Sequence, residues 1–427
     1  MTRRPHISSY RWIICTLLFF ATTVNYIDRQ ILSLLKPILD DQFHWTNAQF
    51  GMINSAFQAA YGIGLFFFGW FIDRFGTKVG FAVSIASWSL AALGHALVTS
   101  IGGFFAARIA LGLGEGGNFP AAVKAVAQWF PQRERALATA LFNSGSNVGA
   151  IIAPAVVPWV AYAFGWQWAF VFAGLAGFVW IAAWLPLYGA PETLDRVSAA
   201  EREHILGDQT AVPQETSAPL GFRQVLHYRK AWSFIVCKFL TDPVWWFFLI
   251  WLPDFFKKTR GLDIKSSWLL LVTIYAIVTV LSIALGWLPG YLAARGMAPS
   301  RARKIGLFVP AILVLPILAV SLAGNWTAVI LIGLAGAAHQ AWSANLFSTV
   351  SDMFPKTAVA TLTGIGGMAG SIGGILFPIA CGVILDRFPD QGYTFLFGIC
   401  GLAYIVAFAV NQMLAPNFDP VKIRAAS

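Results

Sequence analysis

The sequence predicts an all-α polytopic membrane protein with twelve transmembrane helices in two pseudo-symmetric six-helix bundles. Three observations lead to this prediction. First, 58% of the 427 residues are hydrophobic and 11% are charged, whereas soluble domains contain about 25% charged residues. Second, apolar stretches of roughly 20 residues, each able to cross a hydrocarbon core of about 30 Å, recur along the whole chain. Third, short motifs of the first half return in the second.

The expected spans form two groups of six. The first group is 12–33, 49–72, 79–99, 102–125, 136–160 and 166–188, and the second is 231–256, 267–293, 304–323, 326–350, 358–385 and 393–414. The first apolar run is too long for a signal peptide and has no small-residue cleavage site, so we take it as a spanning helix. We therefore expect an N-terminal bundle over residues 1–190, a cytoplasmic linker over 191–230 and a C-terminal bundle over 231–427.

The net charge of +10 comes from bases that gather in alternate loops. They precede the first span and follow the second, fourth, sixth and eighth: Arg3, Arg4, Arg11, Arg74, Lys78, Arg133, Arg135, Arg196, Arg202, Arg223, Arg229, Lys230, Arg295, Arg301, Arg303 and Lys304. This positive-inside pattern predicts an even-numbered helical bundle with both termini in the cytoplasm, rather than a nucleic-acid-binding protein. Three bases on the opposite side break the pattern, flanked by Asp254 and Asp263: Lys257, Lys258 and Arg260.

Two pairs of segments indicate an internal duplication. Gly69–Gly76 closes the second span and is similar to Gly290–Gly296, which closes the eighth. Gly149–Pro154 in the fifth span is similar to Gly373–Pro378 in the eleventh. A duplicated six-helix unit predicts a ligand site between the halves, near the bilayer midplane.

The loop after the second span carries the most specific local motif. Its residues resemble the loop between helices two and three of the major facilitator superfamily: Gly69, Asp73, Arg74, Gly76 and Lys78. Glycines allow helices to approach closely, and the acid and bases can form a conformational latch with a neighbouring helix end. The second copy of the loop has Ala294 in place of the acid, so we expect a weaker latch there.

Ionisable residues inside predicted spans are functional candidates, because burying a charge in the bilayer is costly. Asp28 and Arg29 lie in the first span, although they can instead be an interfacial pair reaching for water. Arg108 and Glu115 lie on one face of the fourth span, two helical turns or roughly 10 Å apart. The glycines of Gly112–Gly117 thin the helix around the acid. A purely structural ion pair is the alternative for this second pair.

A third charged pair, Lys238 and Asp242, opens the seventh span with i,i+4 spacing. The pair can neutralise itself, with Pro243 kinking the helix, or it can be functional, and both interpretations stay open. Trp245 and Trp246 lie well inside the span, which favours the wall of a cavity over an interfacial belt.

Uncharged polar residues line three other spans. They are Asn143, Ser144, Ser146, Asn147, His339, Gln340, Ser343, Asn345 and Ser371. Each alone is more often a helix–helix hydrogen bond, but together they suit a hydroxyl-rich solute. The four cysteines lie in apolar spans without metal-like spacing and are interpreted as buried small hydrophobes: Cys15, Cys237, Cys381 and Cys400.

The charged motifs of the first, fourth and seventh spans resemble the anion:cation symporters of the major facilitator superfamily, over nearly the whole chain. They are most similar to the bacterial hexuronate transporters, which import glucuronate and galacturonate with protons. The resemblance assigns functional positions to Tyr26, Asp28, Arg29, Tyr61, Arg108 and Glu115. It implies that Asp28 and Glu115 are the protonatable acids. Where some sister transporters carry a glutamine in the fifth helix, this chain has Ser146 and Asn147.

A coupling scheme follows from these residues. Arginine binds a carboxylate with a planar fork of donors, so we expect Arg29, assisted by Arg108, to hold the substrate. In the empty protein we expect Asp28 to pair with Arg29 and Glu115 with Arg108; protonation of Asp28 then frees Arg29. The other candidate substrate contacts are Tyr26, Tyr61, Ser146, Asn147, Trp246, His339, Gln340 and Ser371.

The predicted function is proton-coupled import of a small organic anion, a hexuronate above all, by alternating access. Another sugar acid (galactonate or glucarate), an aromatic carboxylate, proton-independent uniport and anion exchange remain alternatives. A membrane enzyme is disfavoured, because the chain has no HExxH, GxSxG or paired His/Cys spacing. A sensor is disfavoured by the short central linker. We expect a monomer in the lipid bilayer, with no cofactor, metal or nucleic acid.

Overall fold

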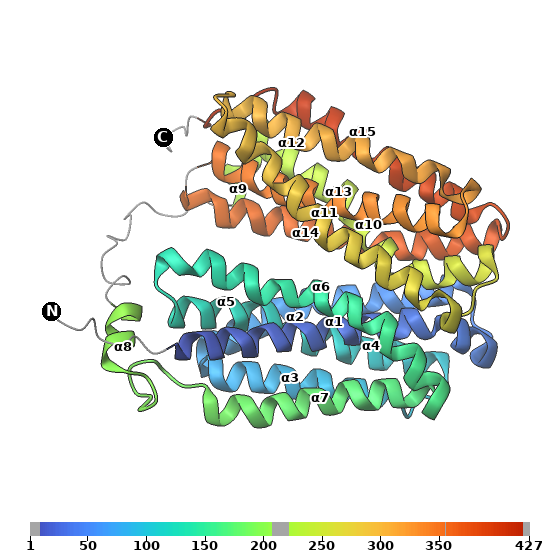
Figure 1. The fold of residues 1–427 in the computed structure, drawn as a ribbon, viewed down its shortest axis with the longest axis horizontal. Helices are drawn as coiled ribbons and strands as arrows, with labels where there is room; N and C mark the ends of the chain where they lie inside the picture. Colours follow the sequence, from blue (N-terminus) through green and yellow to red (C-terminus); the bar gives the residue numbers. More distant parts are fainter. Residues whose placement is uncertain (1–8, 207–221, 355, 422–427) are drawn as a thin grey trace. The chain divides into compact units, whose positions relative to one another are not determined.

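Helices make up most of the computed structural model, which describes residues 9–206, 222–354 and 356–421 (Figure 1). The predicted all-α class is confirmed. The helices form two compact units: Met1–Ile38 with Ala56–Glu215, and Leu39–Ser55 with Thr216–Ser427. The second unit thus includes a short segment from the first half of the sequence, which the predicted boundaries at 190 and 230 did not anticipate. Of the bases counted above, Arg3 and Arg4 lie outside the described residues.

Helices α1 and α2 contribute residues to both units, and the first unit contains the next six helices. The bounds are α1 Tyr10–Phe43, α2 Asn47–Phe75, α3 Thr77–His95, α4 Ile101–Glu115, α5 Asn118–Trp129, α6 Gln132–Phe164, α7 Trp166–Leu187 and α8 Ala199–Leu206. The second unit contains α9 Phe222–Leu226, α10 Arg229–Arg260, α11 Ile264–Ala294, α12 Pro299–Val314, the 3₁₀ helix η1 Leu315–Leu322, α13 Asn325–Met353, α14 Lys356–Arg387 and α15 Gly392–Leu414.

Eleven helical segments among the described residues are long and apolar enough to cross a membrane. The expected span 102–125 is missing from this set because it is divided into α4 and α5. The division falls at Gly116 and Gly117, whose backbone angles stay in the right-handed helical region. Together, α4 and α5 therefore form one helix that is interrupted for two residues directly after Glu115. This interrupted helix is the twelfth predicted span.

Two matching glycines make the same kind of helix contact, one in each unit. A Cβ atom on Gly149 of α6 would lie 2.5 Å from the carbonyl oxygen of Thr23 in α1, and one on Gly373 of α14 would lie 2.7 Å from that of Phe239 in α10. Each glycine thus lets its helix contact the backbone of the first long helix of its own unit. These are the two segments whose sequences are similar, so the internal duplication extends to packing.

The loops that close the similar segments also match in backbone conformation. Gly76, between α2 and α3, has φ +85°, and Gly296, between α11 and α12, has φ +90°. Glycine adopts positive φ without steric cost. A Cβ on Gly69 or Gly76 would meet no atom within 4 Å among the described residues. Close helix approach, the reason proposed from the sequence, is therefore wrong for both, and Gly76 serves the turn instead.

The α1–α2 corner, Leu39–Ser55, is fixed to the second unit by the end of α14. The Asp386 carboxylate accepts hydrogen bonds from the backbone N–H groups of Asn47 (2.9 Å) and Ala48 (2.8 Å), the first residues of α2. It also accepts one from the Asn47 side-chain amide (2.8 Å). A carboxylate at a helix N-terminus satisfies free donors and favours the helix dipole.

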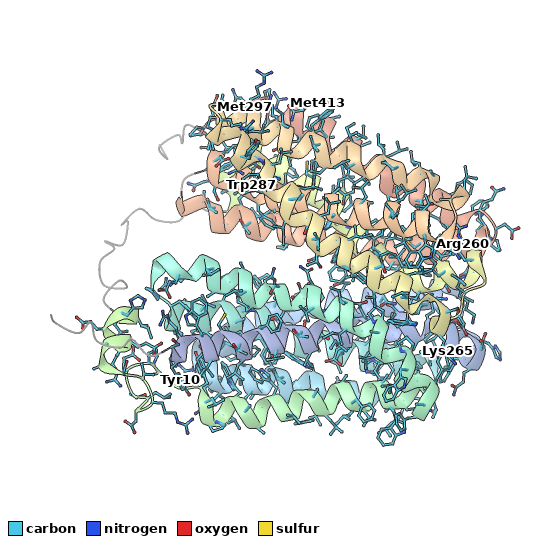
Figure 2. The ribbon with its side chains drawn as sticks, viewed as in Figure 1. Tyr10, Arg260, Lys265, Trp287, Met297 and Met413 are labelled. Carbon is cyan, nitrogen blue, oxygen red and sulfur yellow. The ribbon has the colours of Figure 1, made fainter. Side chains whose placement is uncertain are left out.

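The same corner accounts for two of the bases that broke the charge pattern. Lys257 pairs with Asp41 at 3.1 Å, and Lys258 donates to the Asn47 side-chain oxygen at 2.6 Å. Arg260, labelled in Figure 2, donates instead to the backbone oxygen of Val320 at 2.6 Å. Each of the three bases thus has a partner within the second unit.

Helix α8 of the linker contacts the start of α1, where Figure 2 labels Tyr10. The buried Glu201 carboxylate accepts from the backbone N–H groups of Tyr10 (3.2 Å) and Arg11 (3.1 Å), and from the Arg11 guanidinium (3.1 Å). Arg11 and His204 also bond to Glu134 at 2.9 Å each. Partial burial opposes the effect, but these hydrogen bonds lower the pKa of Glu134. The contribution of the ionised Glu134 carboxylate to the stability of the protein is complete above about pH 4.3, the pKa of glutamate in the unfolded chain. This contribution is lost as the pH falls through the lower pKa that Glu134 has in the folded protein.

We expect Glu201→Gln to destabilise the protein by about 1.5–3 kcal/mol, because the variant loses charge-assisted hydrogen bonds at a buried helix start. Thermal unfolding of the detergent-solubilised protein measures this as a lower Tm. The matched control is Glu203→Gln, since Glu203 is an exposed acid on the same helix. Equal Tm values for the two variants would show that the contact between α8 and α1 does not contribute to stability.

Candidate functional site

The predicted charged residues of the first unit come from α1 and α4. Asp28 and Arg29 lie midway along α1, which continues unbroken to Phe43. Asp28 is 1% exposed, and the Arg29 side chain is 7% exposed. The alternative that these two residues reach for interfacial water is therefore wrong.

Glycines bring α2 and α4 close together beside α1. A Cβ on Gly112 would lie 2.4 Å from the carbonyl oxygen of Phe57, and one on Gly116 would lie 2.3 Å from the carbonyl carbon of Gly64. Any side chain at these positions would push the helices apart. The glycines around Glu115 thus let α4 approach another helix closely, as the sequence predicted.

Glu115 meets Arg29. The Arg29 Nε lies 2.7 Å from Glu115 Oε2, and the Glu115 side chain is fully buried. The Arg29 guanidinium also lies over the rings of Tyr61 (4.4 Å to the centroid) and Tyr26 (5.1 Å). The expected pairing of Asp28 with Arg29 is therefore wrong in this structure. Adjacent residues of a helix point to different sides, so Asp28 does not face the Arg29 side chain, and Glu115 of α4 pairs with it instead.

Asp28 is buried, and its carboxyl group has no hydrogen-bond partner among the described residues. The nearby charges that act on it are those of Glu115 and Arg108. An unpaired carboxylate ion in such a place costs several kcal/mol. This arrangement therefore suits a neutral carboxyl group that carries a proton.

Arg108 is the second buried cation. Its Nη2 donates to the backbone oxygen of Arg29 at 3.4 Å, and its guanidinium lies 5.3 Å from the ring centroid of Phe57. Its Nε has no hydrogen-bond partner among the residues that the structure describes. With Asp28 neutral, the two arginines and Glu115 carry one net positive charge. The cluster can then accept one anionic group.

The serine and asparagine of the fifth predicted span lie on α6. Ser146 and Asn147 are both half-buried. The Ser146 hydroxyl donates to the carbonyl oxygen of Asn143 at 2.6 Å, so its lone pairs remain available to a donor. These positions suit a polar lining, and their contact with substrate stays a prediction.

In the second unit, His339 is held by its neighbours. Its ring stacks on Trp245 with 5.5 Å between the centroids and an interplanar angle of 6°. Its Nδ1 bonds to the hydroxyl of Tyr404. Trp246 packs on α14, where a Cβ on Gly374 would lie 3.0 Å from its ring. Gln340 and Ser371 are half-buried.

The loop of the predicted latch contacts α5 and α7. Lys124 of α5 binds Asp73 at 2.7 Å and the backbone oxygen of Ile72 at 3.1 Å. The backbone oxygen of Lys78 accepts from the Trp184 indole at 3.0 Å. The Asp73 side chain is largely exposed, so the ion pair contributes less than about 1 kcal/mol. A conformational role for this loop remains a prediction.

Two residues that make these contacts were not predicted from the sequence. Phe57 lies against both guanidinium groups, at 5.6 Å from Arg29 and 5.3 Å from Arg108. It is one of 36 phenylalanines, and nothing in its spacing distinguishes it. Lys124 did leave a signal, because it is a lone base at the end of a predicted span.

Comparison with known proteins agrees with the fold. The model of the Major Facilitator Superfamily matches residues 18–378. The chain belongs to this superfamily. It is therefore a transporter rather than an enzyme. Among superfamily members, the hexuronate transporter of Escherichia coli (strain K12) is 32% identical over 98% of this chain and 96% of that protein. The galacturonate transporter of Dickeya chrysanthemi is 36% identical over 61% of this chain and 76% of that protein.

A solved structure supports the same fold. A bacterial homologue of the human lysosomal transporter Spinster has a TM-score of 0.76 and 16% identity, over 96% of this chain and 97% of that one. The superfamily fold, with twelve helices in two related halves, is thus the fold of this chain.

Proposed function

We propose that the protein imports a hexuronate, glucuronate or galacturonate, together with protons across a bacterial inner membrane. The observation that carries the proposal is a cluster in the first unit of two buried arginines, one paired acid and one acid without a hydrogen-bond partner in the part of the chain that the structure describes. The names of the two relatives, hexuronate transporter and galacturonate transporter, support the substrate class. The positive-inside pattern supports termini in the cytoplasm.

Charge balance links the proton to the anion. With Asp28 ionised, the charges of Arg29, Arg108, Asp28 and Glu115 cancel, and no anion is needed. With Asp28 protonated, one positive charge remains, and a substrate carboxylate balances it. A proton and a carboxylate therefore enter together or leave together, because either one alone leaves an uncompensated charge in a low-dielectric site.

Each charged residue of the cluster has a separate role. Arg29 offers a planar fork of donors to the carboxylate. Glu115 pairs with the Arg29 guanidinium in the empty protein. When substrate binds, the Glu115 carboxylate must leave the guanidinium or share it with the substrate carboxylate. Arg108 is the nearby cation that an ionised Asp28 can pair with. Alternating access of the two halves then exposes the site to either side of the membrane.

Proton stoichiometry decides the role of the membrane potential. One proton per monoanion is electroneutral, whereas each further proton adds about 2.3 kcal/mol per 100 mV. Uptake measured with and without a potential at fixed proton gradient distinguishes these cases.

Uptake of labelled glucuronate into proteoliposomes tests the proposal. We expect accumulation driven by an inward proton gradient, inhibited best by galacturonate and less by galactonate or an aromatic acid. Inhibition best by galactonate or an aromatic acid would move the substrate to another carboxylate. Uptake at the same rate without the gradient would contradict proton coupling and favour uniport or exchange.

A further inference from the structure

Asn25 of α1 lies beside the charged cluster of the first unit. It precedes Arg29 by one helical turn, so the two side chains lie on the same face of α1. The Glu115 carboxylate of α4 pairs with Arg29 and also lies beside the Asn25 amide. All three residues belong to the first unit, so their arrangement does not depend on the second.

Asn25 and Glu115 each bury a polar atom that makes no hydrogen bond in the part of the chain that the structure describes. Asn25 is 1% exposed, and both its Nδ2 and its Oδ1 lack a hydrogen-bond partner among the described residues. Glu115 uses Oε2 for the Arg29 guanidinium, while its Oε1 has no hydrogen bond within the described ranges. A buried polar atom without a partner destabilises the state that contains it. A donor and an acceptor that are neighbours are thus both unused.

A substrate carboxylate at Arg29 removes the partner of Glu115. Arg29 then binds the substrate with its planar fork, and the Glu115 carboxylate is left as a buried ion. Such an ion needs another hydrogen-bond donor close by. The Asn25 amide can be this donor, because it lies beside the carboxylate and its Nδ2 makes no hydrogen bond to any residue that the structure describes.

Arg108, the other donor whose charge acts on Glu115, has a different role in the proposed scheme. Its guanidinium donates to the backbone oxygen of Arg29 at 3.4 Å, and it is the cation that pairs with Asp28 when Asp28 is ionised. The Asn25 amide is neutral. A hydrogen bond from Asn25 to Glu115 therefore leaves the charge balance between one proton and one carboxylate unchanged.

We propose that Asn25 is the second partner of Glu115, and that the carboxylate turns from Arg29 to the Asn25 amide when substrate binds. Asn25 is then a positioning residue, since it acts through Glu115. The unpaired atoms destabilise the empty protein, and the new hydrogen bond stabilises the bound one, so both effects favour binding. This inference rests on the proposed function and adds the residue that lets Glu115 release Arg29.

A double-mutant cycle on the binding of labelled glucuronate tests the inference. Asn25→Leu keeps the approximate shape of the side chain but removes the donor, and Asn25→Ala removes the donor without a branched side chain. Each variant should weaken binding about tenfold or more, because the Glu115 carboxylate then has no amide to turn to. In the Glu115→Gln background the same changes should alter affinity about twofold or less, since no carboxylate ion has to find a new partner.

Asn54→Leu is the matched control, because it removes another buried asparagine amide, which donates to the backbone oxygen of Phe50 in its own helix at 2.9 Å. We expect this control to leave affinity unchanged in both backgrounds. Asn25 variants that bind glucuronate as wild type does, or that lose the same factor in both backgrounds, would overturn the inference. Absence of glucuronate binding by wild type would instead overturn the proposed substrate, and the same cycle is then measured with the carboxylate that wild type binds.

Discussion

Replacing Asp28 by asparagine will abolish accumulation against a gradient while leaving exchange of substrate across the membrane. Asparagine has the shape of the protonated carboxyl group but cannot release a proton, so the cluster keeps its single positive charge. Substrate can then bind and cross, but no proton accompanies it. With a proton gradient of one pH unit and one proton per substrate, wild type can accumulate substrate up to about tenfold. The variant should only equilibrate it.

The measurement is uptake of labelled glucuronate into proteoliposomes with an inward proton gradient, beside counterflow without one. The control is Asp352→Asn, which removes an acid from a partly exposed pair with Arg303 and should accumulate within about twofold of wild type. Continued accumulation by Asp28→Asn would remove Asp28 from the coupling scheme. Loss of counterflow as well would assign it to binding instead.

Replacing Arg29 by lysine should weaken substrate binding by about a hundredfold or more. Lysine keeps the charge but loses the planar fork that binds a carboxylate in bidentate fashion, and it is more strongly hydrated beside the rings of Tyr26 and Tyr61. Removing one member of a buried charged contact costs about 2–5 kcal/mol. Binding of labelled glucuronate to the purified protein gives the ratio directly.

The control for this variant is Arg303→Lys, which makes the same exchange in a partly exposed pair and should change affinity less than twofold. A similar change of affinity in both variants would mean that the effect is not specific to the cluster. Glu115→Gln provides a second comparison, because it frees the Arg29 fork without removing it. We expect that variant to bind substrate at least as tightly as wild type.

Much of the fold could be predicted because the bilayer restricts it. Spans of about 20 apolar residues must be helices, since no water satisfies their backbone. The interruption after Glu115 was not predicted, although Gly116 and Gly117 were visible, because glycines in membrane helices more often mark close packing than a break. The position of Leu39–Ser55 in the second unit was also missed, since it depends on contacts such as Asp386 with Asn47 that are distant in sequence.

The charged residues of the site were predicted, but their pairing was not. Asp28, Arg29, Arg108 and Glu115 are visible as costly charges in apolar spans. Which acid meets which arginine depends on how α1, α2 and α4 cross, and sequence spacing within one helix says nothing of that. The role of Phe57 could not be predicted for the same reason. The sequence does not distinguish an aromatic residue that contacts a cation from the other aromatic residues of an apolar helix.

The α1–α2 corner has a consequence for how the protein is made. The ribosome completes Leu39–Ser55 long before it makes Trp251, against which Phe50 packs at 5.3 Å, or Asp386, whose carboxylate receives the start of α2. A fragment that begins after the linker lacks this segment and leaves Asp386 without those donors. The second half of the sequence by itself therefore lacks contacts that the second unit has in the full chain.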